Sequence, residues 1–150
     1  MKRKKLLIDI LLFCTLLISF VTGKNLAHSD TVMVWVAHIA FSVAFIILMV
    51  IHLFVNGRGW FDAGKKLFRG EKYKSVRGRY VVDWLLMIVW VVVFLSGFPA
   101  IGYKLGVESM FVFTKVFHSG FSNIGIILSI VHVIQHKNQI RSYFTKQKDA

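Results

Sequence analysis

The sequence predicts an all-α membrane protein, a four-transmembrane-helix bundle made of two repeated helical hairpins. Three observations lead to this fold class: a composition that is 56% hydrophobic, four long apolar segments and an internal repeat. Such a composition lies outside the range of soluble globular domains. Each segment is near or above the roughly 20 helical residues that cross about 30 Å of hydrocarbon. Because they are continuously apolar and not alternating, they argue against a β-barrel. They cover residues 6–23, 31–55, 80–103 and 110–135.

The first segment follows the basic start MKRKK and can be read as a cleaved signal peptide. We expect a retained span instead, because Asp9 interrupts the hydrophobic region and no A-x-A cleavage site follows it. Cys14 lies in the same segment and is the single cysteine of the chain, so no internal disulfide can form. We expect this cysteine to be an ordinary apolar side chain.

The net charge of +12 is distributed as a topology signal. Sixteen of the nineteen Lys and Arg residues lie before the first segment, between the second and third, or after the fourth. By the positive-inside rule, both termini and the central loop are therefore cytoplasmic. The expected electrostatic partner is anionic membrane lipid, and no nucleic acid is expected. Trp60 and Phe61 stand beside basic residues in the central loop, which indicates a short amphipathic segment at the membrane surface. The alternative is a docking surface for a cytoplasmic electron donor.

The second and fourth segments are related by a shift of 80 residues. HIAFSVAFIILMVIH, residues 38–52, aligns with HSGFSNIGIILSIVH, residues 118–132, and seven of fifteen positions are identical. The first and third segments align with a shift of 74, which places Asp9 over Asp83. Each half is therefore a hairpin, and both hairpins have the same orientation in the membrane. The predicted organisation is a single domain, residues 1–150, with repeat 1 at about 6–56, a cytoplasmic loop at 57–79, repeat 2 at about 80–136 and a cytoplasmic tail at 137–150.

Each repeat carries two histidines fourteen residues apart, His38 with His52 and His118 with His132. On a helix, that interval is roughly 21 Å of height and brings both side chains to nearly the same face. If the second and fourth segments face each other, His38 meets His118 and His52 meets His132. A structural zinc ion needs four ligands, whereas a haem needs two axial ligands and fits an apolar cleft between helices. The sequence therefore predicts two bis-histidine haem sites, and the filled axial positions favour electron transfer.

The alternative is that these are four buried histidines that only hydrogen-bond to their neighbours, and the duplicated spacing argues against it. If they are ligands, we expect each ring to donate its other N–H to a carbonyl about one turn earlier.

Three titratable residues near the cytoplasmic ends are weaker candidates: Asp9, Asp83 and His136. The aspartates fit the first turn of their helices, where the helix dipole favours a carboxylate. The alternative is a role in proton transfer beside the inner haem or a quinone, in which His136 would take part. Neighbouring basic residues that could pair with the aspartates are Lys4, Lys5 and Arg79.

Several smaller features have two interpretations each. Lys115, one turn before a histidine ligand, can reach an outer-haem propionate or snorkel to the interface. Gly23 and Gly97 can let a porphyrin edge approach the backbone or serve simple helix contact. Phe45 and Gly125 lie midway between the histidines. An aromatic opposite a glycine there can be ordinary packing between membrane helices, or it can assist electron coupling between the two haems.

The order of these features resembles the small bacterial flavinylation-associated cytochromes, which belong to the four-helix b-type cytochromes. The resemblance covers nearly the whole chain: an Asp-to-Gly span, a two-histidine span, a basic loop containing tryptophan, and the same pair of spans again. It implies two non-covalent b-type haems in the bacterial cytoplasmic membrane. It also implies electron transfer to or from an extracytoplasmic redox partner that can carry flavin, with His38, His52, His118 and His132 as ligands.

We therefore expect an electron-transfer protein or oxidoreductase subunit more than a stand-alone enzyme. One alternative is a quinol-oxidising cytochrome b subunit that uses the quinone pool, with Asp9, Asp83 or His136 accepting protons. A second alternative is a haem-free membrane protein whose histidines bind or transport a metal. The sequence has no nucleotide-binding glycine motif and no C-x-x-C-H motif for covalent haem attachment.

Overall fold

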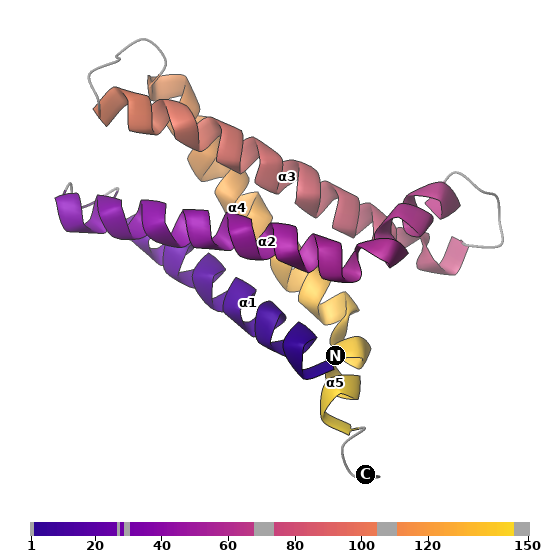
Figure 1. Cartoon of the computed structure of the whole chain (residues 1–150). Coiled ribbons are helices and arrows are strands. Elements are labelled where there is room, and N and C mark those ends of the chain that lie inside the picture. Colours follow the sequence, from indigo (N-terminus) through magenta and orange to yellow (C-terminus); the bar gives the residue numbers. More distant parts are fainter. Residues whose placement is uncertain (1, 27, 29–30, 68–73, 105–110, 146–150) are drawn as a thin grey trace. The chain divides into compact units, whose positions relative to one another are not determined.

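The structure is a computed structural model that describes residues 2–26, 28, 31–67, 74–104 and 111–145. Every regular element within these residues is an α-helix, which confirms the predicted all-α class. Figure 1 shows the helices in chain order, which are α1 (Lys2–Asn25), α2 (Val32–Leu67), α3 (Lys74–Lys104), α4 (Phe111–Gln135) and α5 (Lys137–Thr145).

Four of these helices are long and apolar enough to cross a membrane, as the sequence predicted. Large apolar side chains cover their outer surfaces; Val43 is 49% exposed, Leu95 64% and Ile127 61%. Contiguous apolar surface of this extent suits lipid rather than water. The chain is therefore a multi-pass membrane protein. The spans within the described residues are Lys4–Asn25, Val32–Asn56, Tyr80–Pro99 and Lys115–Gln135.

The chain divides into two compact units, residues 1–65 with 139–150 and residues 66–138. In the first unit, α1 and α2 run in opposite directions and form a hairpin (Figure 1). Hydroxyl groups join the two helices between the centre of the hairpin and its connection, where Oγ of Ser19 and Oγ of Ser42 are 2.7 Å apart. At the connection, the backbone N–H of Trp35 donates to Thr31 O at 3.2 Å, which helps to close the first turn of α2.

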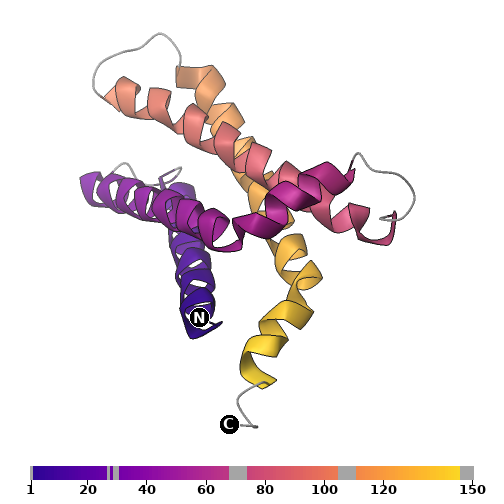
Figure 2. The same ribbon diagram turned by 45° about the vertical axis from the view of Figure 1, so that its right-hand side comes forward.

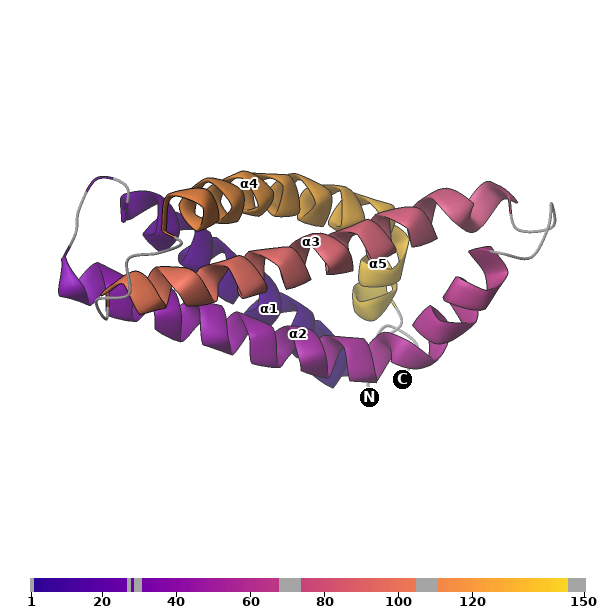
Figure 3. The ribbon, with the colours of Figure 1, turned by 90° about the horizontal axis from the view of Figure 1, so that it is seen from above.

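In the second unit, α3 and α4 form the other hairpin and also run in opposite directions (Figure 3). Its centre is filled by Trp90 of α3, which is 6% exposed. A Cβ atom at Gly125 of α4 would lie 3.0 Å from Cζ2 of Trp90, so the glycine makes room for the indole. Close approach of this kind is a common use of glycine in membrane helices.

Two helix boundaries differ from the sequence prediction. The expected loop begins at residue 57, but α2 continues as a helix to Leu67. Likewise α3 begins at Lys74, six residues before the apolar segment. Hydropathy marks where a helix leaves lipid and does not mark where its backbone hydrogen bonds end, which explains both differences. Figure 2 shows that the last turns of α2 bend away from the axis of its span.

The C-terminal segment also contains a helix that the sequence analysis did not predict. α5 covers Lys137–Thr145, and its apolar residues Ile140 and Phe144 are four positions apart. That interval brings the two side chains to one face of the helix. The hydropathy pattern missed α5 because the segment is short and largely polar.

Candidate functional site

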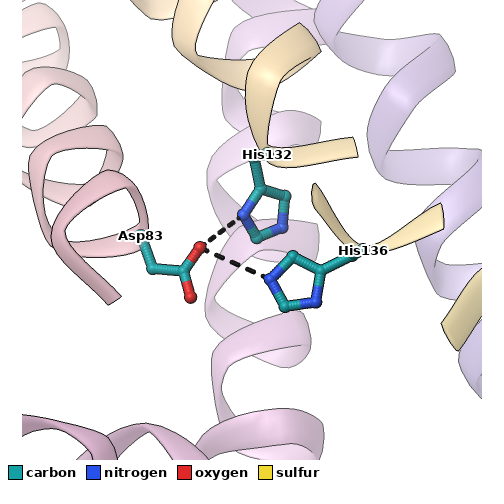
Figure 4. A group of neighbouring side chains, drawn as sticks. All are labelled: Asp83, His132 and His136. Carbon is teal, nitrogen blue, oxygen red and sulfur yellow. Dashed lines mark hydrogen bonds and ion pairs between the residues drawn. The ribbon is translucent and has the colours of Figure 1, made fainter. Parts of the chain in front are cut away.

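At the basic end of each hairpin, a histidine donates a hydrogen bond to an aspartate of the neighbouring helix. We call this the basic end because the Lys- and Arg-rich parts of the sequence adjoin it. Nδ1 of His52 on α2 donates to Oδ1 of Asp9 on α1 at 2.8 Å. Nδ1 of His132 on α4 donates to Oδ1 of Asp83 on α3 at 2.7 Å (Figure 4). The two contacts are equivalent under the repeat, and all four side chains are half-buried.

At the opposite end of each hairpin, which we call the turn end, a histidine donates to a backbone carbonyl of the neighbouring helix. Nδ1 of His38 donates to Ser19 O at 2.9 Å, and Nδ1 of His118 donates to Val93 O at 2.9 Å. Ser19 and Val93 differ by 74 positions, which is the shift that relates the first and third spans. The internal repeat is therefore present in the hydrogen bonds of the histidines as well as in the sequence.

A hydroxyl group accompanies each turn-end histidine. Oγ1 of Thr22 donates to Ser19 O at 2.9 Å and lies 3.4 Å from Nδ1 of His38. In the second hairpin, Oγ of Ser96 donates to Val93 O at 3.0 Å and lies 3.3 Å from the corresponding histidine nitrogen. In each hairpin, one backbone carbonyl oxygen therefore accepts from both a hydroxyl and an imidazole.

These acceptors assign one tautomer to all four histidines. A carbonyl or carboxylate oxygen can only accept, so the proton of each neutral imidazole is on Nδ1 and the lone pair is on Nε2. Histidines that bind metals take this form when Nδ1–H is held by a carbonyl or a carboxylate. The arrangement therefore prepares His38, His52, His118 and His132 to act as ligands through Nε2.

The prediction of a carbonyl acceptor one turn earlier in the same helix is wrong. All four acceptors belong to the other helix of the hairpin, and at the basic end they are carboxylates. A carbonyl one turn earlier in a helix already accepts the N–H four residues later. At the basic end the neighbouring helix offers a side-chain carboxylate, which has no such backbone donor. Ser19 and Val93 lie inside α1 and α3, so competition does not explain the choice of acceptor at the turn end.

Gly23 makes room for the ring of His38, whereas Gly97 lies against the equivalent ring without needing to be glycine. A Cβ at Gly23 would lie 2.9 Å from Cε1 of His38, and one at Gly97 would lie 3.4 Å from Cε1 of His118. The sequence analysis expected a porphyrin edge or another helix beside these glycines and did not identify the histidine rings as their neighbours. The conformational freedom of glycine is not the reason for its use here, since the space that a Cβ would occupy decides it.

The Asp–His hydrogen bonds had a signal in the sequence that was missed, which is an equal interval on both helices of each hairpin. Asp9 precedes Gly23 by fourteen residues, and His38 precedes His52 by fourteen. In an antiparallel pair of helices, a contact between Gly23 and His38 then brings the other two residues to the same depth. The second hairpin has the same intervals, so once the glycine–histidine contact is known, the sequence intervals place both Asp–His pairs.

The helix-dipole interpretation of the two aspartates is wrong. α1 begins at Lys2 and α3 at Lys74, so Asp9 and Asp83 lie about two turns or more inside their helices. The dipole effect is confined to the first turn. Of the basic residues predicted to pair with these aspartates, Lys5 donates through Nζ to Val55 O at 3.2 Å. The side chain of Arg79 lies outside the described side chains.

His136 adds a second imidazole to the basic end of the second hairpin. Its Nε2 is 3.5 Å from Oδ1 of Asp83, too long for a strong hydrogen bond, and its ring lies 4.6 Å from the ring of His132 (Figure 4). The equivalent residue of the first hairpin is Asn56, whose Nδ2 lies 3.3 Å from Nδ1 of His52. Within the described residues, ligand atoms of Asp83, His132 and His136 all lie within 4.8 Å of one another, as a metal ion would require.

The remaining predicted residues are placed as follows. Lys115 is an exposed residue of α4 at the start of its span, one turn before His118. Phe45 is buried in the first hairpin, whereas Gly125 lies against Trp90 of its own hairpin. Gly125 therefore packs against an aromatic side chain of its own hairpin, and the expected contact between Phe45 and Gly125 stays a prediction.

Comparisons of the chain with protein-family profiles, with curated proteins and with solved structures found no match.

Proposed function

We propose that this chain is a dihaem b-type cytochrome that transfers electrons across the membrane. In this proposal, His38 and His118 are the axial ligands of one haem, and His52 and His132 are those of the other. The observation that carries it is the common state of four histidines in duplicated positions, each with Nδ1–H held by an acceptor and the lone pair on Nε2.

The chain's residues fit haem better than they fit a multinuclear metal site. The two histidines of each helix are fourteen residues apart, or roughly 21 Å along the axis. Two bis-histidine sites use all four side chains, and a bis-histidine haem supplies a reversible one-electron Fe(III)/Fe(II) change with no position open to oxygen.

The contribution of the protein is to orient the ligands and to control their surroundings. Carbonyls at the turn end and carboxylates at the basic end hold the imidazole rings in one orientation. Gly23 leaves room for the ring of His38. Apolar side chains of the spans keep water away, which also affects the reduction potential.

The distribution of charge supports a location in the bacterial cytoplasmic membrane with both termini and the basic ends in the cytoplasm. The turn ends would then face an extracytoplasmic redox partner, and the resemblance suggests a flavoprotein. Lys115 is placed in the sequence to contact a propionate of the outer haem.

Oxidation of quinol by the same chain is a second candidate function, favoured by the position of His136 beside Asp83. Quinol oxidation releases protons, and a carboxylate with a neighbouring imidazole can accept them. A quinol-dependent reduction rate that falls at least tenfold in the Asp83→Asn variant, with haem content unchanged, would support this function.

The spectrum of the purified protein tests the main proposal. We expect a reduced-minus-oxidised spectrum of b type and a stoichiometry of two haems per chain. The double variant His52→Ala/His132→Ala and the double variant His38→Ala/His118→Ala should each lose one haem, while Ser129→Ala, which changes a hydroxyl bonded to Gly125 O, should keep both. Purified protein with bound zinc, copper or other metal and no haem would overturn the proposal and favour the haem-free alternative.

A further inference from the structure

The four histidines differ in the charge of their hydrogen-bond acceptors. At the turn end, His38 and His118 donate to neutral peptide carbonyls. At the basic end, His52 and His132 donate to carboxylates. Both hairpins show the same difference, so it is a property of the repeated unit and not of one contact.

A carboxylate changes an imidazole ligand more than a peptide carbonyl does. It attracts the Nδ1 proton more strongly, which leaves more electron density on the ring and makes Nε2 a more basic ligand. Its negative charge also stabilises additional positive charge nearby, and this effect is large where water is scarce. Both effects favour the oxidised state of a redox centre bound to Nε2.

We propose that Asp9 and Asp83 make the redox centre at the basic end the one of lower potential, so that electrons favour the centre at the turn end. This inference rests on the proposed function and adds a direction to it. The two aspartates are positioning residues, since they act through His52 and His132. An electron that passes between the two ends breaks no bond and needs no further reactant.

The two aspartates are expected to differ in strength. The side chain of Asp83 is 14% exposed and that of Asp9 is 27% exposed, so water screens Asp83 less. Lys5 also lies near the basic end of the first hairpin, where its Nζ donates to Val55 O and lies 3.4 Å from Oδ1 of Asn56. This cation offsets part of the charge of Asp9, whereas His136 beside Asp83 carries a charge only when it is protonated. Replacement of Asp83 should therefore have the larger effect.

If the basic ends are cytoplasmic, the direction of favoured transfer is from the cytoplasmic side to the outer side. A negative charge moving outward also follows the usual membrane potential, which is negative inside. The arrangement would therefore suit delivery of electrons to an acceptor outside the cell membrane, and it would oppose uptake of electrons from that side.

An equilibrium redox titration of the detergent-purified holoprotein, followed by its spectrum, tests the inference. We expect two spectral components with different midpoint potentials. The component that is lost in His52→Ala/His132→Ala should be the lower one, and the component lost in His38→Ala/His118→Ala should be the higher. Asp83→Asn should raise the lower midpoint potential. The equilibrium constant for reduction should increase at least tenfold, which corresponds to about 59 mV for a one-electron couple. Asp9→Asn should raise it by less, and neither should move the higher midpoint.

Two controls separate charge from other effects. Asp149→Asn removes one carboxylate from the C-terminal tail and should leave both midpoints unchanged. Asp83→Glu keeps the charge and should keep the lower midpoint closer to the native value than Asp83→Asn does. If Asp83→Asn binds no haem at the basic end, Asp9→Asn and the order of the native midpoints decide the question.

The outcomes distinguish the inference from the proposed function. Two haems with the higher midpoint at the basic end, or with a lower midpoint that neither Asp→Asn variant raises, would overturn the inference alone. A protein that binds no haem would overturn both.

Discussion

Asp83 on α3 accepts a hydrogen bond of 2.7 Å from Nδ1 of His132 on α4, across 49 residues of sequence. The first hairpin repeats the contact between Asp9 and His52 at 2.8 Å. A carboxylate inside a membrane span is costly unless a partner compensates it. The histidine supplies that compensation, and the aspartate in turn fixes the orientation of the imidazole ring. Each pair therefore explains two residues that are unfavourable when considered singly.

Replacement of Asp83 by Ala should weaken binding of haem at the basic end. The Nδ1–H of His132 would lose its acceptor, at a cost of roughly 1–3 kcal/mol, and loss of such a partner typically lowers metal affinity about 10- to 100-fold. Titration of the apoprotein with haemin measures the affinity of each site. Asp83→Asn retains an oxygen acceptor and should weaken binding less. Equal loss in the two variants would show that the hydrogen bond itself contributes little.

Gly23→Ala and Gly97→Ala should differ in effect although the positions are equivalent in the repeat. The new Cβ at Gly23 would lie 2.9 Å from the ring of His38 and would force it to move, whereas the distance at Gly97 is 3.4 Å, an ordinary contact. Overpacking of this kind costs roughly 1–3 kcal/mol. Gly23→Ala should therefore lower thermal stability and turn-end haem content. The idea that glycine is present to seat the ring would be wrong if both variants behaved as wild type.

The centres of the two hairpins should be exchangeable. Trp90 and Gly125 of the second hairpin correspond to Leu16 and Phe45 of the first. The larger side chain of the pair is therefore on α3 in the second hairpin and on α2 in the first. Gly125→Phe alone should clash with the indole, and Trp90→Leu alone should leave a cavity costing about 2–5 kcal/mol. The double variant Trp90→Leu/Gly125→Phe should recover much of the loss.

A double-mutant cycle on thermal unfolding in detergent measures this exchange. We expect a favourable coupling free energy of about 1–3 kcal/mol between the two substitutions. Additive losses would mean that the two positions are filled independently and that the complementary sizes in the repeat have no energetic basis.

The topology can be tested with single cysteines in a Cys14→Ala background. Asn138→Cys adjoins the basic end of the second hairpin, and Asn25→Cys lies at the turn end of the first. Because most Lys and Arg residues adjoin the basic ends, an impermeant thiol reagent should label residue 25 in intact spheroplasts. It should label residue 138 at least tenfold less until the membrane is opened. The reverse pattern would invert the proposed direction of electron transfer across the membrane.

The sequence predicted the spans well because hydropathy over a helical segment is a local property. Four spans, the all-α class and the repeat are all visible in the order of residues. Local signals failed at helix ends, where α2 continues to Leu67 and α5 forms from polar sequence. They also misassigned Asp9 and Asp83 to the first helical turn, since the apolar segment begins later than the helix.

By itself, the sequence determined four membrane-spanning helices and histidines at equal intervals in two repeats, because hydropathy and helical periodicity depend only on neighbouring residues. Only the tertiary structure decided which atom each histidine donates to. That choice depends on the register of two antiparallel helices, which brings together residues 43 and 49 positions apart at the basic ends. Register is set by the packing of side chains such as His38 against Gly23 and Trp90 against Gly125, and such packing exists only between helices.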